Sequence, residues 1–221
     1  MEKLPKINII YEDNHLLVVE KPVNIPVQED NSKDIDMITL LKDYRKVHEN
    51  KKGEAYLGLV HRLDRPVGGV MVFAKTSKAA SRLSEEIRNN DFHKTYLAVV
   101  EGTLPSKGKF EDYLVKDNKE NKSYVTTKDK GKYSSLEYEV LKEKDNLSLV
   151  KINLITGRSH QIRVQFSSRN HPLVGDSKYN NNPNNINIAL FAIELSIIHP
   201  ITKERLTFTL DIPNRYPFNI F

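Results

Sequence analysis

Residues 61–75 read H-R-L-D-R-P-V-G-G-V-M-V-F-A-K and combine a charged loop with a buried strand. The apolar run 70–74 has the length and composition of a strand that is covered on both faces. Gly68 and Gly69 directly before it permit backbone angles or close approaches that a side chain would forbid. The stretch therefore predicts a tight connection that leads from a polar loop into the core.

The charged loop holds Asp64 between Arg62 and Arg65. A nearby cation favours the ionised form of a carboxylate, and a carboxylate anion can accept a proton or attack carbon. The alternative is a surface turn with a structural Asp–Arg pair. The residues alone leave both interpretations open.

Apolar runs and alternating patterns recur along the chain and predict the other elements. Amphipathic helices are expected at 36–46 and after a capping Ser77, ending at 89–91. The remaining strand candidates are 7–11, 15–20, 94–101, 134–142, 147–155, 162–166, 186–195 and 205–210. Because strands do not alternate regularly with helices, we expect an α+β fold with a mixed, mostly antiparallel central sheet and a few flanking helices.

The composition restricts the class of protein. The 221 residues, of which 38% are hydrophobic, fit a single domain over 1–221 that can divide into two lobes with a cleft between them. The absence of cysteine excludes disulfides and thiolate chemistry. The sequence has no apolar run that could span a membrane, and its start has no secretory stretch. We expect a cytoplasmic monomer with no membrane association.

The formal net charge of +5 is unevenly distributed. Residues 151–179 hold five Lys or Arg and one acid, and residues 107–132 hold eight lysines against five acids. Two basic segments on one face would bind the phosphates of a nucleic acid. The alternative for 107–132 is a solvated hairpin.

A second motif, T-G-R-S-H-Q-I-R, occupies residues 156–163. Gly157 predicts a turn, and the strand expected after it places Arg163 and Ile162 on opposite faces. An arginine at a turn can clamp phosphate or carboxylate, and a surface salt bridge is the alternative. His160, His171 and Asp176 are of metal-ligating types, but their spacing does not demand a metal, and none is expected.

Several motifs in order are similar to one family. They are D-N-H-L-L-V-V-E-K-P-V-N-I-P-V from position 13, H-R-L-D-R with G-G, K-T-Y-L-A-V-V-E-G from 94, G-R-S-H-Q-I-R followed by H-P-L-V-G-D, A-L-F-A-I-E-L from 189 and H-P-I-T-K-E-R-L-T-F from 199. Together they resemble the RluA-type family of RNA pseudouridine synthases, from about residue 9 to residue 213. The resemblance implies the pseudouridine synthase fold and an isomerase that converts uridine to pseudouridine in RNA.

The resemblance also implies roles for individual residues. Asp64 would be the nucleophile, Arg163 would pair with it, and Tyr96 would stack on the target base. Arg62 would fill the space left when the base leaves the RNA stack. The side chains assigned to RNA binding are Arg62, Arg65, Lys94, Arg158 and His160. The side chains assigned to the pocket are Leu63 and Ile162.

Two departures from the family pattern are visible. Val67 and Gly68 stand where Thr-Ser is common, and no room is expected for an N-terminal S4 domain.

The reaction changes no oxidation state, so no cofactor is expected. The partner would be a structured ribosomal or transfer RNA. Two alternatives are a non-catalytic RNA-binding or ribosome assembly protein on the same fold, and a hydrolase, for which the sequence lacks a second acid or a histidine at recognisable spacing.

Overall fold

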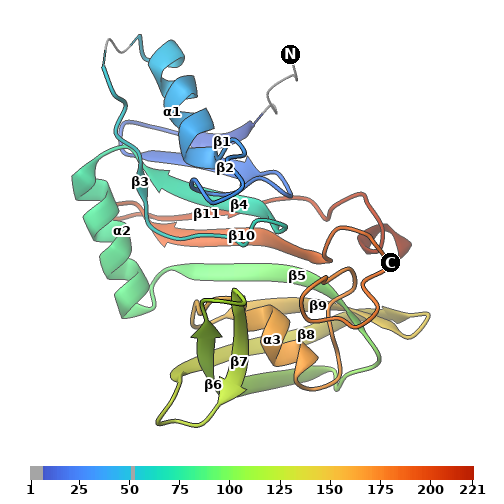
Figure 1. The fold of residues 1–221 in the computed structure, drawn as a ribbon. Helices are drawn as coiled ribbons and strands as arrows, with labels where there is room; N and C mark the ends of the chain where they lie inside the picture. Colours follow the sequence, from blue (N-terminus) through green and yellow to red (C-terminus); the bar gives the residue numbers. More distant parts are fainter. Residues whose placement is uncertain (1–6, 51–52) are drawn as a thin grey trace. The chain divides into compact units, whose positions relative to one another are not determined.

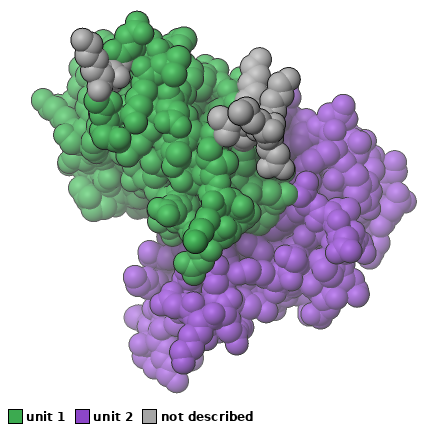
Figure 2. All heavy atoms as spheres, turned by 45° about the horizontal axis from the view of Figure 1, so that its top comes forward, with its two compact units in different colours: residues 1–92, 194–210 green, residues 93–193, 211–221 purple. Residues whose placement is uncertain are grey.

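A computed structural model describes residues 7–50 and 53–221. The chain divides into two compact units, unit 1 with residues 1–92 and 194–210 and unit 2 with residues 93–193 and 211–221 (Figure 2). Residues 1–6, on which the expected lack of a secretory signal partly rests, lie outside the described residues. No helix in the described part of the chain is long and apolar enough to cross a bilayer.

Unit 1 is built on antiparallel strands (Figure 1). β1 (Asn8–Glu12) and β2 (Leu16–Lys21) form the predicted hairpin, and β2 also pairs with β4 (Gly68–Ala74). β3 (Gly58–Leu59) pairs with β4, and residues Glu194–Ile198 of β10 (Leu190–Ile198) pair with β11 (Arg205–Thr209). All seven residues of β4 are buried, as its unbroken apolar run predicts.

Two helices flank this sheet. α1 (Met37–His48) is capped by the Asp36 carboxylate, and α2 (Ser77–Asn89) is capped by Thr76, whose hydroxyl accepts from the Ala79 N–H. The prediction that Ser77 is the cap was wrong by one residue, because Ser77 already has helical geometry. The core contains Leu16, Val18, Val70, Val72, Leu83, Leu195 and Ile197.

Unit 2 holds a second antiparallel arrangement in the order β5-β9-β8-β6-β7. Its strands are β5 (His93–Glu101), β6 (Lys107–Asp117), β7 (Lys122–Thr126), β8 (Lys132–Lys144) and β9 (Leu147–Leu154). Phe166 of α3 (Gln161–Ser167) packs on Phe110 and Tyr138, with ring centroids 5.0 and 5.7 Å apart. α3 thus covers one face of the sheet. A short 3₁₀ helix, η1 (Phe218–Ile220), lies near the C-terminus.

These elements confirm the α+β class and the mostly antiparallel sheet. The strand expected at 162–166 is wrong, since those residues lie in helix α3. The sequence analysis placed Arg163 on the face opposite Ile162, with a surface salt bridge as the alternative, yet Gln161, Arg163 and Gln165 are all buried. Gln161 donates to the Ser135 carbonyl, Arg163 to Asp176 and Gln165 Nε2 to Asp112, so the polarity of these side chains does not indicate exposure. β6 and β7 were not among the strand candidates, but they form the hairpin that was the alternative interpretation of residues 107–132.

The β1–β2 turn depends on the carboxylate of Asp13. One oxygen accepts from the N–H groups of His15 (2.7 Å) and Leu16 (2.6 Å), and the other lies 2.7 Å from His199 Nε2. Burial alone would raise the pKa of Asp13, but these hydrogen bonds outweigh it and hold that pKa below its usual value.

We predict that Asp13→Ala lowers the free energy of unfolding by about 2 kcal/mol near neutral pH, because two backbone N–H groups lose their acceptor. A lowered carboxyl pKa stabilises the fold above the unfolded value of about 4, and this contribution is lost as pH falls through the folded value. Urea unfolding between pH 3 and 7 should therefore show a shallower acid dependence for Asp13→Ala. The exposed Asp43→Ala is the control, and equal acid slopes for wild type and Asp13→Ala would contradict the prediction.

Candidate active site

Asp64 lies in a short turn that ends at β4, and a buried lysine fixes this turn. The Asp64 carbonyl accepts from the Val67 N–H at 2.9 Å, and Asp64 itself is partly exposed. Lys21, at the end of β2, is fully buried. Its Nζ donates to the carbonyls of Pro22 (2.9 Å), Arg65 (3.0 Å) and Val67 (2.8 Å). These three bonds match the three donors of an ammonium group.

The electrostatics of Lys21 reflect its position. Burial lowers the pKa of Lys21 to about 7, the negative charge of Asp64 acts against this shift, and Arg65 adds to it. The charge of Lys21 is therefore coupled to that of Asp64, and the three carbonyl acceptors around its Nζ favour the protonated form. The sequence analysis did not assign it a role, because a lysine at the end of a strand is ordinarily exposed.

His61 and Gly69 hold the same loop on its other sides. His61 Nε2 accepts from the Val72 N–H at 3.1 Å, and its ring meets Phe92 edge-on with centroids 5.0 Å apart. Gly69 has φ of +125°, in the region that favours glycine. The conformational role predicted for the glycine pair is thus met at Gly69.

The two arginines beside Asp64 differ in their surroundings. Arg62 is exposed. Arg65 reaches toward loop 24–34, where it donates to the Asn24 carbonyl (3.2 Å) and the Ser32 hydroxyl (2.9 Å) and pairs with Asp34. The charge of Arg65 also interacts with that of Lys21, as the charge of Asp64 does. The RNA-binding roles of Arg62 and Arg65 stay predictions.

In unit 2, Arg163 is held by a buried carboxylate. Its Nε and Nη2 donate to the two oxygens of Asp176 at 2.8 and 2.6 Å, and the two side chains are 3% and 0% exposed. This bidentate geometry fixes the plane of the guanidinium. Asp176, considered above only as a metal-ligating type, is thus a partner of Arg163, and the described residues contain no group of three or more metal-ligating side chains.

The turn before α3 is organised by Gln161. Its Oε1 accepts from the Thr156 hydroxyl (2.8 Å) and the Arg158 N–H (3.0 Å), and its Nε2 donates to the Ser135 carbonyl. The Arg158 side chain is directed to the Tyr133 carbonyl, at 2.9 Å. Gln161 was missed because a glutamine in an apparent strand carries no positional signal.

Lys94 lies against this same turn. A Cβ added to Gly157 would lie 3.2 Å from Lys94 Nζ, so the glycine makes room for the lysine. Burial lowers the pKa of Lys94. The structure therefore brings Lys94 and the G-R-S-H motif together within unit 2.

Tyr96 and Ile162 are both buried, at 6% and 5% exposure. Tyr96 is opposite Ile152, which is opposite Tyr138, so all three side chains project from the face of the sheet that α3 covers. Leu63 is also buried, in unit 1. The structure thus places Tyr96 and Arg163 on the same side of the unit 2 sheet.

The predicted residues fall into two sets. Unit 1 carries Arg62, Leu63, Asp64 and Arg65. Unit 2 carries Lys94, Tyr96, Arg158, His160, Ile162 and Arg163. That Asp64 lies close to Tyr96 and Arg163 in one active site stays a prediction.

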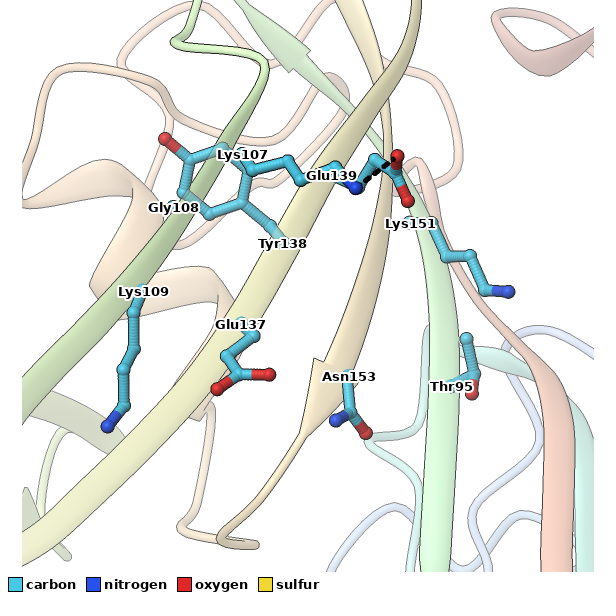
Figure 3. Close-up of a pocket in the computed structure, with 9 residues that line it drawn as sticks. All are labelled: Thr95, Lys107, Gly108, Lys109, Glu137, Tyr138, Glu139, Lys151 and Asn153. Atoms are coloured by element: carbon cyan, nitrogen blue, oxygen red, sulfur yellow. Dashed lines mark ion pairs between the residues drawn. The ribbon is translucent and has the colours of Figure 1, made fainter.

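A pocket of about 690 Å³ in unit 2 is lined by residues of β5, β6, β8 and β9, most of which alternate with Tyr96, Ile152 and Tyr138 along these strands (Figure 3). Its lining mixes lysines with glutamates, and Lys107 pairs with Glu139 at 3.0 Å. The predicted site residues are not among its lining. The lining residues are Thr95, Lys107, Gly108, Lys109, Glu137, Tyr138, Glu139, Lys151 and Asn153. Because opposite charges neutralise each other there, this pocket is a poor site for a polyanion.

Comparison with known proteins identifies the family. The family described as RNA pseudouridylate synthase matches residues 15–168. Ribosomal large subunit pseudouridine synthase C of Buchnera aphidicola subsp. Baizongia pistaciae is 34% identical over 91% of this chain and 65% of its own length. The uncharacterized RNA pseudouridine synthase YhcT of Bacillus subtilis is 32% identical over 94% of this chain and 69% of its own length. The chain therefore spans about two thirds of the length of these relatives.

A solved structure agrees with this assignment. Human RNA pseudouridylate synthase domain containing 4 has a TM-score of 0.79 and 25% identity, over 94% of this chain and 89% of that one. The chain belongs to the RNA pseudouridylate synthase family, and the resemblance to its RluA-type members predicted from the motifs is confirmed.

Lys21→Met should lower the free energy of unfolding by about 3 kcal/mol, because the carbonyls of Pro22, Arg65 and Val67 lose their donor. Urea unfolding of the purified protein measures this loss. The exposed Lys78→Met on α2 is the matched control and should unfold like wild type. If the two variants were equally stable, the three bonds of Lys21 would not hold the loop.

Asp176→Asn should lower the free energy of unfolding by about 2–3 kcal/mol, because it replaces the charged member of a buried, bidentate pair with Arg163 by a neutral amide. The control is Glu139→Gln, which removes a charge from the exposed Lys107–Glu139 pair and should change the unfolding midpoint little. Thermal unfolding of both variants gives the comparison. A similar small shift in both would show that Arg163 is neutralised by another group.

Proposed function

We propose that this protein isomerises uridine to pseudouridine in RNA, with Asp64 as the nucleophile. The observation that carries the proposal is the construction of the Asp64 turn. A fully buried ammonium and the ring of His61 hold this turn, and the carboxylate-bearing residue stays partly exposed. A nucleophile needs this combination of a fixed backbone and access to substrate.

The reaction rearranges bonds within one nucleotide. The N1–C1′ bond breaks, the uracil rotates, and a C5–C1′ bond forms, while the hydrogen on C5 is replaced and N1 gains one. In one route the Asp64 carboxylate attacks C1′ as the N1–C1′ bond breaks, or assists that departure without bonding, and any bond to C1′ breaks again when C5 bonds to C1′. In the other route the carboxylate adds to C6 of the base and is released after C5 has bonded to C1′. Arg163 would stabilise the carboxylate and orient it, with its own plane set by Asp176.

Access to the base requires that the nucleotide leave its stack, which costs a few kcal/mol. The Tyr96 ring would offset part of this cost by stacking on the uracil. Arg62, which is exposed on the Asp64 loop, would occupy the vacated position in the RNA. Lys94, Arg65, Arg158 and His160 would contact the backbone, and Leu63 and Ile162 would line the pocket.

We propose ribosomal RNA of the large subunit as the first substrate to test. The support is that relatives with 30–34% identity are named ribosomal large subunit pseudouridine synthases C and D. Transfer RNA is the second substrate. The β6–β7 hairpin, with the rest of 103–133, and the loop 180–185 would select the target uridine by shape. The protein would act in the cytoplasm as a monomer.

The decisive variant is Asp64→Asn, which preserves the size of the side chain but removes its charge. We expect pseudouridine formation to fall by about a thousand-fold or more, with RNA affinity within about two-fold of wild type, because phosphate contacts supply most of the affinity. The measurement is mapping of pseudouridines in total RNA from a deletion strain after incubation with each purified protein. Asp43→Asn on the exposed face of α1 is the control.

Two results would contradict the proposal. If Asp64→Asn formed pseudouridine at the wild-type rate, Asp64 would not be the nucleophile. Tight RNA binding by the wild-type protein without any new pseudouridine would favour a non-catalytic RNA-binding protein.

A further inference from the structure

Tyr179 lies in the loop that follows Asp176 and has no role in the function proposed above. Its ring centroid is 5.2 Å from Arg163 Cζ and 5.2 Å from Lys122 Nζ. Cations within about 6 Å of a tyrosine ring are attracted to its face, and the attraction is stronger when the cation is desolvated. Arg163 is 3% exposed. The ring therefore contributes a second restraint on the Arg163 guanidinium beside the carboxylate of Asp176.

The hydroxyl of Tyr179 makes a different set of contacts. It accepts from the Ser123 N–H of β7 at 2.6 Å and lies 2.9 Å from His160 Nδ1. His160 precedes α3 in a left-handed conformation, with φ of +52°. The hydroxyl thus joins the β6–β7 hairpin to the start of the helix that carries Arg163.

The backbone of Tyr179 is also fixed. Its N–H donates to Asp176 Oδ1 at 3.2 Å, the same oxygen that accepts from Arg163 Nη2. Its carbonyl accepts from the Ser167 hydroxyl at 2.7 Å. Asp176, Arg163 and Tyr179 therefore form one connected cluster in which the tyrosine has little freedom to move.

Two further contacts attach the hairpin to this cluster. The Ser123 hydroxyl donates to the Ser159 carbonyl at 2.8 Å, and Lys178 Nζ donates to the Asn121 carbonyl at 2.7 Å. The tip of the hairpin is consequently held by residues on both sides of Tyr179. Tyr179 therefore contacts both the hairpin, through Ser123, and the guanidinium of Arg163.

We propose that Tyr179 is a positioning residue that links the β6–β7 hairpin to Arg163. Its ring sets the orientation of the guanidinium, and its hydroxyl holds the hairpin in the conformation that receives RNA. The inference rests on the proposed function, in which Arg163 acts on Asp64 and the hairpin contacts RNA. The ring and the hydroxyl serve different steps, so two substitutions at one position can separate them.

The experiment compares Tyr179→Phe with Tyr179→Leu in the full chain. Tyr179→Phe keeps the ring, and we expect a single-turnover rate at saturating RNA within about two-fold of wild type, with an RNA Kd raised about five-fold. Tyr179→Leu removes the ring as well, and we expect the saturated rate to fall about ten-fold in addition. Tyr44→Phe on α1, which loses a hydroxyl hydrogen bond to Glu12 at 2.9 Å, should change neither quantity.

A purely structural role would reduce the fraction of folded protein without this separation of rate and affinity. A wild-type saturated rate for folded Tyr179→Leu would overturn the proposal. An equal loss of rate in Tyr179→Phe and Tyr179→Leu would also overturn it, because the ring would then not be the group that acts on Arg163.

A readout without turnover separates this inference from the proposed function. The ¹⁵N NMR signal of Arg163 Nε–H, assigned with Arg163→Lys, should keep its shift and slow exchange in Tyr179→Phe and lose both in Tyr179→Leu. Unchanged signals in Tyr179→Leu would overturn the positioning role. If the wild-type protein formed no pseudouridine, the proposed function would fail while this measurement still tested the contact.

Discussion

A buried cation must be surrounded by oxygen atoms, and this constraint shapes both units of the protein. Lys21 in unit 1 directs its three donors at three backbone carbonyls, while Arg163 in unit 2 directs two of its donors at one carboxylate. Removing such groups from water is costly unless these bonds are made. The loop that carries Arg65 and Val67 is therefore held by Lys21, and the loop that carries Asp176 is held by Arg163.

The same constraint explains how the candidate catalytic residues are supported. Lys21 is fully buried, and two of its three bonds go to the loop that carries Asp64. Asp176 similarly fixes the plane of Arg163 and, through the same oxygen, the backbone of Tyr179. Supporting groups of this kind limit the conformations of a reactive side chain before substrate arrives.

The unit 2 sheet shows why one face serves the site and the other does not. Tyr96 projects toward the face that α3 covers, among buried aromatic rings. The opposite face carries alternating lysines and glutamates and an open pocket that neutralises its own charge (Figure 3). A period of two along each strand separates these faces, so neighbouring residues such as Thr95 and Tyr96 belong to different surfaces.

The sequence by itself determined the α+β class, the β1–β2 hairpin, the buried strand β4 and the motifs that identify the family. These features depend on local patterns of apolar residues, glycines and charges, which act over a few positions. Only the tertiary structure decided that 162–166 is a helix, because Gln161 and Arg163 are polar yet buried against partners distant in sequence. It also decided the partners of Lys21, Asp176 and Tyr179, since hydrogen bonds between residues far apart in the chain leave no periodic signal in it.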